Sequence, residues 1–451
     1  MTSIHVKSAL TPAGWQRDVR VTLAAGLIST IETGVSAQPD DERHDILVSG
    51  MPNLHSHAFQ RGMAGLAEVR GPAADSFWSW RTVMYRFALS MTPDHVEAVA
   101  SQLYMEMLEN GFSRVGEFHY LHHDIDGRPY ADISEMAQRI AAAASETGIG
   151  LTLLPVFYAH SSFGGAQPND GQRRFINGTD SFARLLEGCR AAVKGLADGK
   201  VGVAPHSLRA VTPDELSAVV AMAKGGPVHI HVAEQVKEVE DCIAWSGARP
   251  VQWLLDNAGL DSRWCLIHAT HMTDDETCRM AQAGAIAGLC PVTEANLGDG
   301  TFNALVFRQS GGKFGIGSDS NILIGIPDEL RQLEYSQRLL HRSRNVLAAA
   351  GQSTGRALFD GAIEGGSIAL GSRTTPSPST IAVGQPADMV SLAIPDGGLD
   401  GDAVLDSWLF ANGTKPDCVW VAGQKQVEGG RHRKRDQIST RFRSVMRDLV
   451  A

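Results

Sequence analysis

The sequence predicts an α/β protein in which a barrel of alternating strands and helices is joined to a small β-sandwich domain built from both termini. Two observations support this fold class. The middle of the chain alternates short apolar runs with helix-like stretches, which is the order of elements that a barrel requires. Both ends of the chain instead alternate apolar and polar residues as strands do.

Three stretches of the chain form the two predicted domains. Residues 1–48 form the N-terminal part of the β-sandwich, residues 49–379 form the barrel, and residues 380–451 form the C-terminal part of the β-sandwich together with a final helix. Within the barrel, Thr92-Pro93 predicts the start of a helix over residues 94–109. With 451 residues, the chain is long enough for one large barrel and a smaller domain.

Composition and charge restrict the classes of function. A hydrophobic share of 43% with 20% charged residues is ordinary for a globular protein. The net charge of −10 argues against a nucleic-acid-binding protein. The six cysteines show no C-x-x-C spacing, which predicts reduced core residues rather than disulfides or a metal site. The sequence shows neither a signal peptide nor a membrane-spanning run, which predicts a cytoplasmic protein without a membrane partner.

The most informative motif is Met51-Pro-Asn-Leu-His55-Ser-His57, which follows the strand-like run Ile46-Leu-Val. Residues i and i+2 of an extended segment face the same way, so both imidazoles can reach one ion. On its own this spacing is equally compatible with a hydrogen-bonded histidine pair.

Three later apolar runs favour metal binding over a hydrogen-bonded histidine pair, because each ends in a residue that can bind a metal or move a proton. They end at His231, His268 and Asp319. Together with the first motif they provide three histidines and a carboxylate, namely His55, His57, His231 and Asp319. This nitrogen and oxygen ligand set suits one divalent ion and leaves room for a water molecule. Zinc is the preferred prediction, and iron accepts the same ligands.

This arrangement resembles the amidohydrolase superfamily, whose members place metal ligands at the C-terminal ends of the strands of a (β/α)8 TIM-type barrel. The resemblance covers nearly the whole chain. It implies that His55 and His57 follow the first strand, His231 the fifth, His268 the sixth and Asp319 the eighth. Residues 151–160, interpreted as the fourth strand, contain no lysine or carboxylate to bridge two ions. The resemblance therefore implies a single ion.

Within the superfamily, His231-x-x-Glu234 is typical of the mononuclear deaminase-like branch. Four segments resemble the formimidoylglutamate deiminase family: the first motif extended to Gln60-Arg61, Phe77-Trp-Ser-Trp-Arg81, Gly116-Glu-Phe-His-Tyr120 and Ala204-Pro-His-Ser-Leu-Arg209. The resemblance implies a hydrolase of histidine degradation that converts N-formimino-L-glutamate and water to N-formyl-L-glutamate and ammonia.

That reaction predicts roles for three acidic or basic residues. Glu234 would carry a proton to the departing nitrogen, and its alternative is a structural carboxylate that holds His231. His268 or Asp319 would accept the first proton from water, and His268 alone could instead be a core histidine.

A substrate with two carboxylates also needs cations, because the protein as a whole is acidic. Arg81 and Arg209 are the predicted carboxylate-binding residues, since guanidinium groups bind carboxylates with two parallel hydrogen bonds. Gln60, Tyr120 and His206 would donate further hydrogen bonds. Sequence spacing alone also allows either arginine to form ordinary surface ion pairs.

Two other hypotheses remain from the sequence. The chain could be another deaminase or cyclic amidohydrolase, such as a nucleobase deaminase or an imidazolonepropionase, but a neutral ring has no use for Arg81 and Arg209 together. It could also be a non-catalytic barrel, which the complete ligand set argues against. The predicted partner is thus a small dicarboxylate, with a homodimer as the expected assembly. Tolerance for formimino-aspartate stays open.

Overall fold

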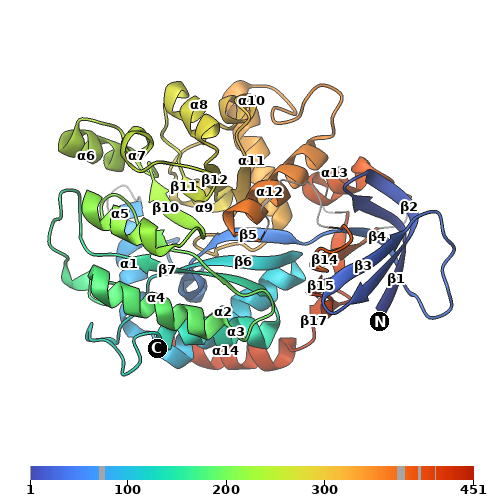
Figure 1. Cartoon of the computed structure of the whole chain (residues 1–451), viewed down its shortest axis with the longest axis horizontal. Coiled ribbons are helices and arrows are strands. Elements are labelled where there is room, and N and C mark those ends of the chain that lie inside the picture. The colour runs from blue at the N-terminus through green and yellow to red at the C-terminus, as the bar shows by residue number, and fades with distance from the viewer. Residues whose placement is uncertain (1, 71–76, 373–380, 395–397, 412, 451) are drawn as a thin grey trace.

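The computed structural model describes residues 2–70, 77–372, 381–394, 398–411 and 413–450, which form a barrel and a terminal sheet (Figure 1). The barrel strands are β5 (Met51–Ser56), β6 (Phe112–His119), β7 (Gly150–Phe157), β8 (Lys200–Val201), β9 (Ala204–Pro205), β10 (Val228–Val232), β11 (Trp264–His268), β12 (Ile286–Leu289) and β13 (Phe314–Ile316). All of their pairings are parallel.

The barrel closes through its fourth strand, which is split into β8 and β9. The hydrogen-bonded order runs β10-β11-β12-β13-β5-β6-β7-β8, with β9 also pairing with β7. Between the two short pieces, the Val203 amide donates to the Pro227 carbonyl at 3.0 Å, and the His229 amide donates to the Val203 carbonyl at 3.0 Å. The predicted (β/α)8 barrel is therefore confirmed.

Helices follow the barrel strands and cover the outside of the ring (Figure 1). They are η1 (Ala58–Met63), α1 (Phe77–Ser90), α2 (Pro93–Glu109), α3 (Glu135–Thr147), η2 (Asp170–Gln172), α4 (Thr179–Val193), α5 (Pro213–Met222), α6 (Val236–Ser246), α7 (Pro250–Asn257), α8 (Asp274–Ala283), α9 (Pro291–Leu297), α10 (Ala304–Gln309), α11 (Ile326–His341) and α12 (Thr354–Ala369). The predicted start of α2 is correct, because Thr92 caps it by accepting a hydrogen bond from the His95 amide.

One strand assignment made from the sequence is wrong. Residues 151–160 belong to β7 and its following loop, which is the third strand of the barrel and not the fourth. The true fourth strand leads to His206 at its C-terminal end, and Lys200 lies at its opposite end, paired with Asp198 at 2.8 Å. No lysine or carboxylate of this strand therefore reaches the predicted ligands.

The strand-like run before the histidine pair is confirmed as a strand, and it belongs to the terminal domain. The run Ile46-Leu-Val lies in β4 (Glu42–Ser49), which belongs to the terminal sheet. His55 lies in the separate strand β5, which starts after Gly50. The boundary between the terminal domain and the barrel therefore lies between these two strands.

The terminal domain is built from one sheet in the order β17-β16-β15-β14-β4-β1-β2-β3. Its other strands are β1 (Thr2–Thr11), β2 (Gly14–Ala24), β3 (Leu27–Glu32), β14 (Met389–Ala393), β15 (Lys415–Val421), β16 (Gln424–Glu428) and β17 (Arg431–His432). Alternate residues face opposite sides. Leu47 and Met389 pack in the sheet's own core, whereas Val48 and Val390 pack into the larger core of the barrel. Both termini therefore contribute to one domain, as predicted.

The C-terminal segment also returns to the barrel. Helix α13 (Asp402–Phe410) lies near α12, and α14 (Arg435–Val450) runs along α2 and α3 (Figure 1). Arg441 on α14 bonds Glu97 at 3.0 Å and Glu146 at 2.7 Å. All six cysteines are free, and five of them are buried as predicted, whereas Cys278 is half-buried. In the described ranges, no helix is both long enough and apolar enough to cross a membrane.

Candidate active site

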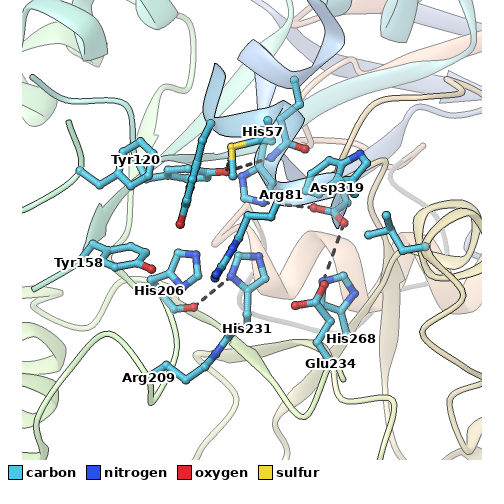
Figure 2. A pocket seen from close by; sticks show the side chains of 16 residues that line it. His57, Arg81, Tyr120, Tyr158, His206, Arg209, His231, Glu234, His268 and Asp319 are labelled. Carbon is cyan, nitrogen blue, oxygen red and sulfur yellow. Dashed lines mark hydrogen bonds and ion pairs between the residues drawn. The ribbon is translucent and has the colours of Figure 1, made fainter. Parts of the chain in front are cut away.

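Every site residue predicted from the sequence lies at the C-terminal end of the barrel. One pocket is lined by His57, Gln60, Arg81, Tyr120, His206, Arg209, His231, Glu234, His268 and Asp319 (Figure 2). His55 lies fully buried behind this lining, in contact with the rings of His57 and His231. Residues from seven separate segments of the chain therefore converge as the strand order requires.

Backbone pairing between the first and eighth strands fixes the position of Asp319. The Asp319 amide donates to the His55 carbonyl at 3.0 Å, and the His57 amide donates to the Asp319 carbonyl at 3.1 Å. The side-chain amide of Asn321 also donates to the His57 carbonyl at 3.0 Å. These bonds hold the carboxylate beside the two rings before any ligand binds.

Three strand ends in the site adopt a left-handed backbone at residues other than glycine. The φ angles are +50° at Ala233, +66° at His268 and +46° at Asp319. Each such residue costs about 1–3 kcal/mol and persists only where the surrounding structure enforces it. The strain occurs where the chain aims side chains into the pocket, which is typical of a functional site.

The side-chain donors of His55, His57, His231 and Asp319 form a compact cluster whose ligand atoms all lie within 4.8 Å of one another. The Nε2 atoms of His55 and His57 are each 3.2 Å from Asp319 Oδ1, and His231 Nε2 is 3.1 Å from His55 Nε2. Four potential ligand atoms thus point at one place.

The outer ring nitrogens show which atoms face the centre of this cluster. His57 Nδ1 donates to the Phe118 carbonyl at 2.9 Å, and His231 Nδ1 donates to the His206 carbonyl at 3.0 Å. A carbonyl only accepts, so each neutral ring carries its proton on Nδ1 and presents an Nε2 lone pair inward. Lone pairs and a carboxylate at this separation repel one another unless a cation lies among them. The residues therefore fit a divalent ion with nitrogen and oxygen ligands.

The protonation of the cluster agrees with this interpretation. Burial lowers the pKa of His55 to about 3 and that of His231 well below its ordinary value, so both rings are neutral as metal ligands must be.

A second group of ionisable residues lies beside the cluster. Glu234 Oε1 is 3.6 Å from His268 Nε2, which is 3.9 Å from Asp319 Oδ2. Burial lowers the pKa of His268, but the carboxylates of Glu234, Glu294 and Asp319 outweigh burial and raise it to about 10. Burial and the neighbouring carboxylates of Asp319 and Glu238 raise the pKa of Glu234, against His268 and Arg209. The group is thus arranged to hold and pass protons.

The other side of the pocket is basic and aromatic. Arg81 enters from α1, and the buried Arg209 follows the fourth strand. Burial raises the pKa of Tyr158 to about 12 against the opposing charges of both Arg209 and Arg81, so the two guanidinium groups act on one region. Tyr120 Oη accepts a hydrogen bond from Gln60 Nε2 at 2.9 Å. This geometry is compatible with a ligand that carries negative charge on this side.

Comparisons with known proteins agree with the site. The amidohydrolase family model matches residues 46–425, and the model of the formimidoylglutamate deiminase HutF N-terminal domain matches residues 1–45. A formimidoylglutamate deiminase from Pseudomonas aeruginosa is 49% identical to this chain over 100% of both proteins. The chain belongs to the amidohydrolase family and, within it, to the formimidoylglutamate deiminases.

Solved structures show that this amidohydrolase shares its whole fold with others. The crystal structure of an amidohydrolase from Brucella melitensis is 65% identical, covers 100% of both chains and has a TM-score of 0.98. An adenosine deaminase from Xanthomonas campestris, solved with bound zinc, is 21% identical, with 99% and 98% of the two chains covered and a TM-score of 0.79. The second likeness concerns the fold alone.

Several residues of the site in this amidohydrolase were not predicted from its sequence. Trp80, Met84, Tyr85, Tyr158, Phe175 and Leu297 also line the pocket. Tyr85 follows Arg81 by four residues on one helix, and this spacing was a usable signal. Glu294 is a different case, because its carboxylate accepts from His268 Nδ1 at 3.3 Å and from the Cys290 amide at 2.9 Å. The contact between Glu294 and His268 joins residues 26 positions apart and could not be predicted from the sequence.

Close packing behind His55 leads to a testable prediction. A Cβ atom on Gly317 would lie 2.7 Å from the Cβ and the carbonyl oxygen of His55. We expect Gly317→Ala to lower the free energy of unfolding by about 1–3 kcal/mol, because the eighth strand must move away from the first. Metal affinity should fall as well, since this movement displaces Asp319.

Urea unfolding and zinc titration measure the two effects. Gly195→Ala is the matched control, because a Cβ at Gly195 meets no atom within 4 Å. Equal stability and equal metal affinity in the two variants would contradict the prediction.

Proposed function

We propose that this chain hydrolyses N-formimino-L-glutamate to N-formyl-L-glutamate and ammonia in a metal-dependent reaction. Water adds to the formimino carbon, the bond from this carbon to the terminal nitrogen breaks, and ammonia leaves. The observation that carries the proposal is the presence of Arg81 and Arg209 in the same pocket as the ligand cluster and Glu234. The similarity to the Pseudomonas aeruginosa deiminase over the full length of both chains supports the same reaction.

We infer that His55, His57, His231 and Asp319 hold one divalent ion and that this ion is zinc. A zinc ion bound by such ligands lowers the pKa of a water molecule to about 7 and so makes it a nucleophile at neutral pH. The nitrogen-rich donor set of the cluster supports this choice. The homodimer and the cytoplasmic location stay predictions of the sequence.

The chain's own residues divide the proton transfers between them. Asp319 lies 3.9 Å from His268 beside the ligand cluster and can take the first proton from the attacking water, because the raised pKa of His268 keeps that ring protonated beforehand. Glu234 lies on the pocket wall, 3.6 Å from His268, with its pKa raised by burial. It can therefore carry a proton to the formimino nitrogen, which departs as neutral ammonia.

Arg81 and Arg209 bind the substrate carboxylates in this proposal. Both guanidinium groups lie on the side of the pocket formed by Tyr85 and Tyr158. Gln60, Tyr120 and His206 surround the space between this side and the ligand cluster. A substrate held at both carboxylates would present its formimino group to Glu234. Binding at two points would thus fix the orientation of the substrate before the reaction.

Ammonia release from purified protein tests the reaction directly. We expect rapid release from N-formimino-L-glutamate and none above background from cytosine, guanine or imidazolone propionate. Release from one of the neutral rings in preference to N-formimino-L-glutamate would contradict the proposal and favour another deaminase of the superfamily. Comparing kcat/KM for N-formimino-L-aspartate, which is one methylene group shorter, shows how strongly the enzyme discriminates by the length of the substrate.

Charge matching provides a second test. We expect Arg81→Met and Arg209→Met each to lower kcat/KM for N-formimino-L-glutamate, with a loss of transition-state stabilisation of about 1.5–3 kcal/mol. Each substitution leaves a substrate carboxylate without its charge-assisted partner. Arg184→Met on the exposed face of α4 is the control. An analogue with its side-chain carboxylate amidated should be a correspondingly poor substrate of the wild type. Unchanged kcat/KM in all three measurements would rule out a dicarboxylate substrate.

A further inference from the structure

We propose that Arg174 is a positioning residue that fixes helix α1 and thereby holds Arg81 in place for substrate binding. This inference rests on the proposed function, in which Arg81 binds a carboxylate. Arg174 lies in the loop after η2, and its side chain does not line the pocket. Any effect that it has on the substrate must therefore pass through other residues.

Arg174 is a charged side chain in the interior of the protein, with 0% of its surface exposed. Its Nε donates to the His123 carbonyl at 2.7 Å. Its Nη1 donates to the carbonyls of Ala88 at 2.5 Å and Met91 at 2.8 Å, and its Nη2 donates to Tyr130 Oη at 3.3 Å. Four of the five N–H groups of this side chain thus donate to neutral oxygen atoms, which come from three separate segments.

Two of these oxygen atoms belong to the end of α1. Ala88 lies in the last turn of the helix and Met91 directly follows it. Carbonyls at this end have no partner within the helix, and the helix dipole makes them negative. A buried guanidinium group that bonds both of them therefore satisfies polar groups that would otherwise be costly to bury, and it fixes where α1 ends.

The same loop also approaches the pocket side of α1. A Cβ atom on Gly171 would lie 2.8 Å from the ring of Tyr85, so glycine permits this close approach. Gln172 Nε2 donates to Tyr158 Oη at 2.8 Å. The ring of Phe175 packs against that of Tyr120, with 5.0 Å between the centroids. Gly171, Gln172 and Phe175 therefore join α1 to the aromatic wall of the pocket.

Helix α1 carries Trp80, Arg81, Met84 and Tyr85 into the pocket, and the Arg81 guanidinium lies 5.5 Å from the centre of the Tyr85 ring. None of the residues proposed to move protons lies on α1. A shift of this helix should therefore weaken substrate binding and leave proton transfer intact. This separation distinguishes Arg174 from a residue that only stabilises the fold.

A double-mutant cycle with Arg81 tests the proposal. We expect Arg174→Met to raise KM for N-formimino-L-glutamate by about 10- to 100-fold, with kcat within about threefold of wild type. In an Arg81→Met background the same substitution should change kcat/KM by less than about threefold, because the residue through which it acts is gone. Arg174→Lys keeps the positive charge but loses the branched guanidinium group. It should therefore have a lower KM than Arg174→Met and a higher KM than the wild type.

Arg173→Met is the matched control, because this neighbouring arginine bonds at the surface to Asp170 and the Ile125 carbonyl. It should leave KM unchanged. Amide hydrogen exchange, measured without substrate, should rise in α1 of Arg174→Met and stay unchanged in the barrel strands. If Arg174→Met does not fold, Arg174→Lys takes its place in the cycle and in the exchange measurement.

The results separate this inference from the proposed function. Losses that multiply in the double variant, or unchanged exchange in α1, would overturn the positioning role. Wild-type protein that does not release ammonia from N-formimino-L-glutamate would instead refute the proposed function, and hydrogen exchange in α1 would still decide whether Arg174 holds the helix.

Discussion

Replacement of Glu234 by glutamine is expected to lower kcat for N-formimino-L-glutamate by about two to four orders of magnitude, the range for a lost general acid or base. Glutamine keeps the size of the side chain and removes its ability to accept and release a proton. Glu234 is 5% exposed, and its carboxylate lies 3.6 Å from His268 Nε2. Among the described residues that line the pocket, Asp319 is the only other carboxylate. Asp319 belongs to the ligand cluster and, in the proposed reaction, takes the proton of the attacking water instead.

Metal content distinguishes this role from a structural one. Glu234 is absent from the cluster of ligand atoms, so the glutamine variant should bind as much zinc as the wild type. Glu240→Gln, on the exposed side of α6, is the control and should leave kcat unchanged. Near-normal turnover of Glu234→Gln, or loss of the metal together with activity, would assign Glu234 to holding His231 instead.

The features that the sequence predicted well are those with a local signal. The helix start at Thr92 depends on one side chain that bonds an amide three residues away. The spacing of His55 and His57 depends on the alternation of a strand. His231 and Glu234 depend on the end of a strand and the turn after it. In each case the residues that determine the structure are neighbours in the chain.

The fourth strand was assigned wrongly because it has no such signal. It consists of two pairs of residues with Gly202 and Val203 between them, which is too short for a recognisable apolar run. A Cβ atom on Gly202 would lie 2.6 Å from the Pro227 carbonyl oxygen, so the neighbouring strand packs directly against the glycine. The strand exists because its neighbours in space complete it, and those contacts are long-range.

The arrangement of the pocket could be predicted only through family resemblance. Arg81 and Arg209 are far apart in the sequence and come from a helix and a loop, and either pattern alone also describes a surface residue. Nothing in the sequence marks Arg174 as a buried residue, because it follows Arg173 and two adjacent arginines are usually exposed to solvent. Its complete burial depends on three carbonyls from two other segments and on the hydroxyl of Tyr130.

Removal of the metal is expected to abolish ammonia release, with a loss of at least about four orders of magnitude, because no other group of the site can ionise water at neutral pH. Active protein should contain one ion per chain, since the fourth strand offers His206 where a bridging ligand would be needed. Elemental analysis measures the number of ions per chain, and an ammonia assay measures the activity, each before and after treatment with a chelator.

Thermal stability provides a measurement that does not depend on activity. Without a cation, the Nε2 atoms of His55 and His231 face each other at 3.1 Å beside the Asp319 carboxylate. Added zinc should therefore stabilise the folded state, by about 2.7 kcal/mol when free zinc is 100 times its Kd, and raise Tm accordingly. His231→Ala should lose both the ion and the zinc-dependent rise in Tm, whereas His341→Ala, at the exposed end of α11, should keep both. Two ions per chain in active protein, or full activity without metal, would refute the single-ion site.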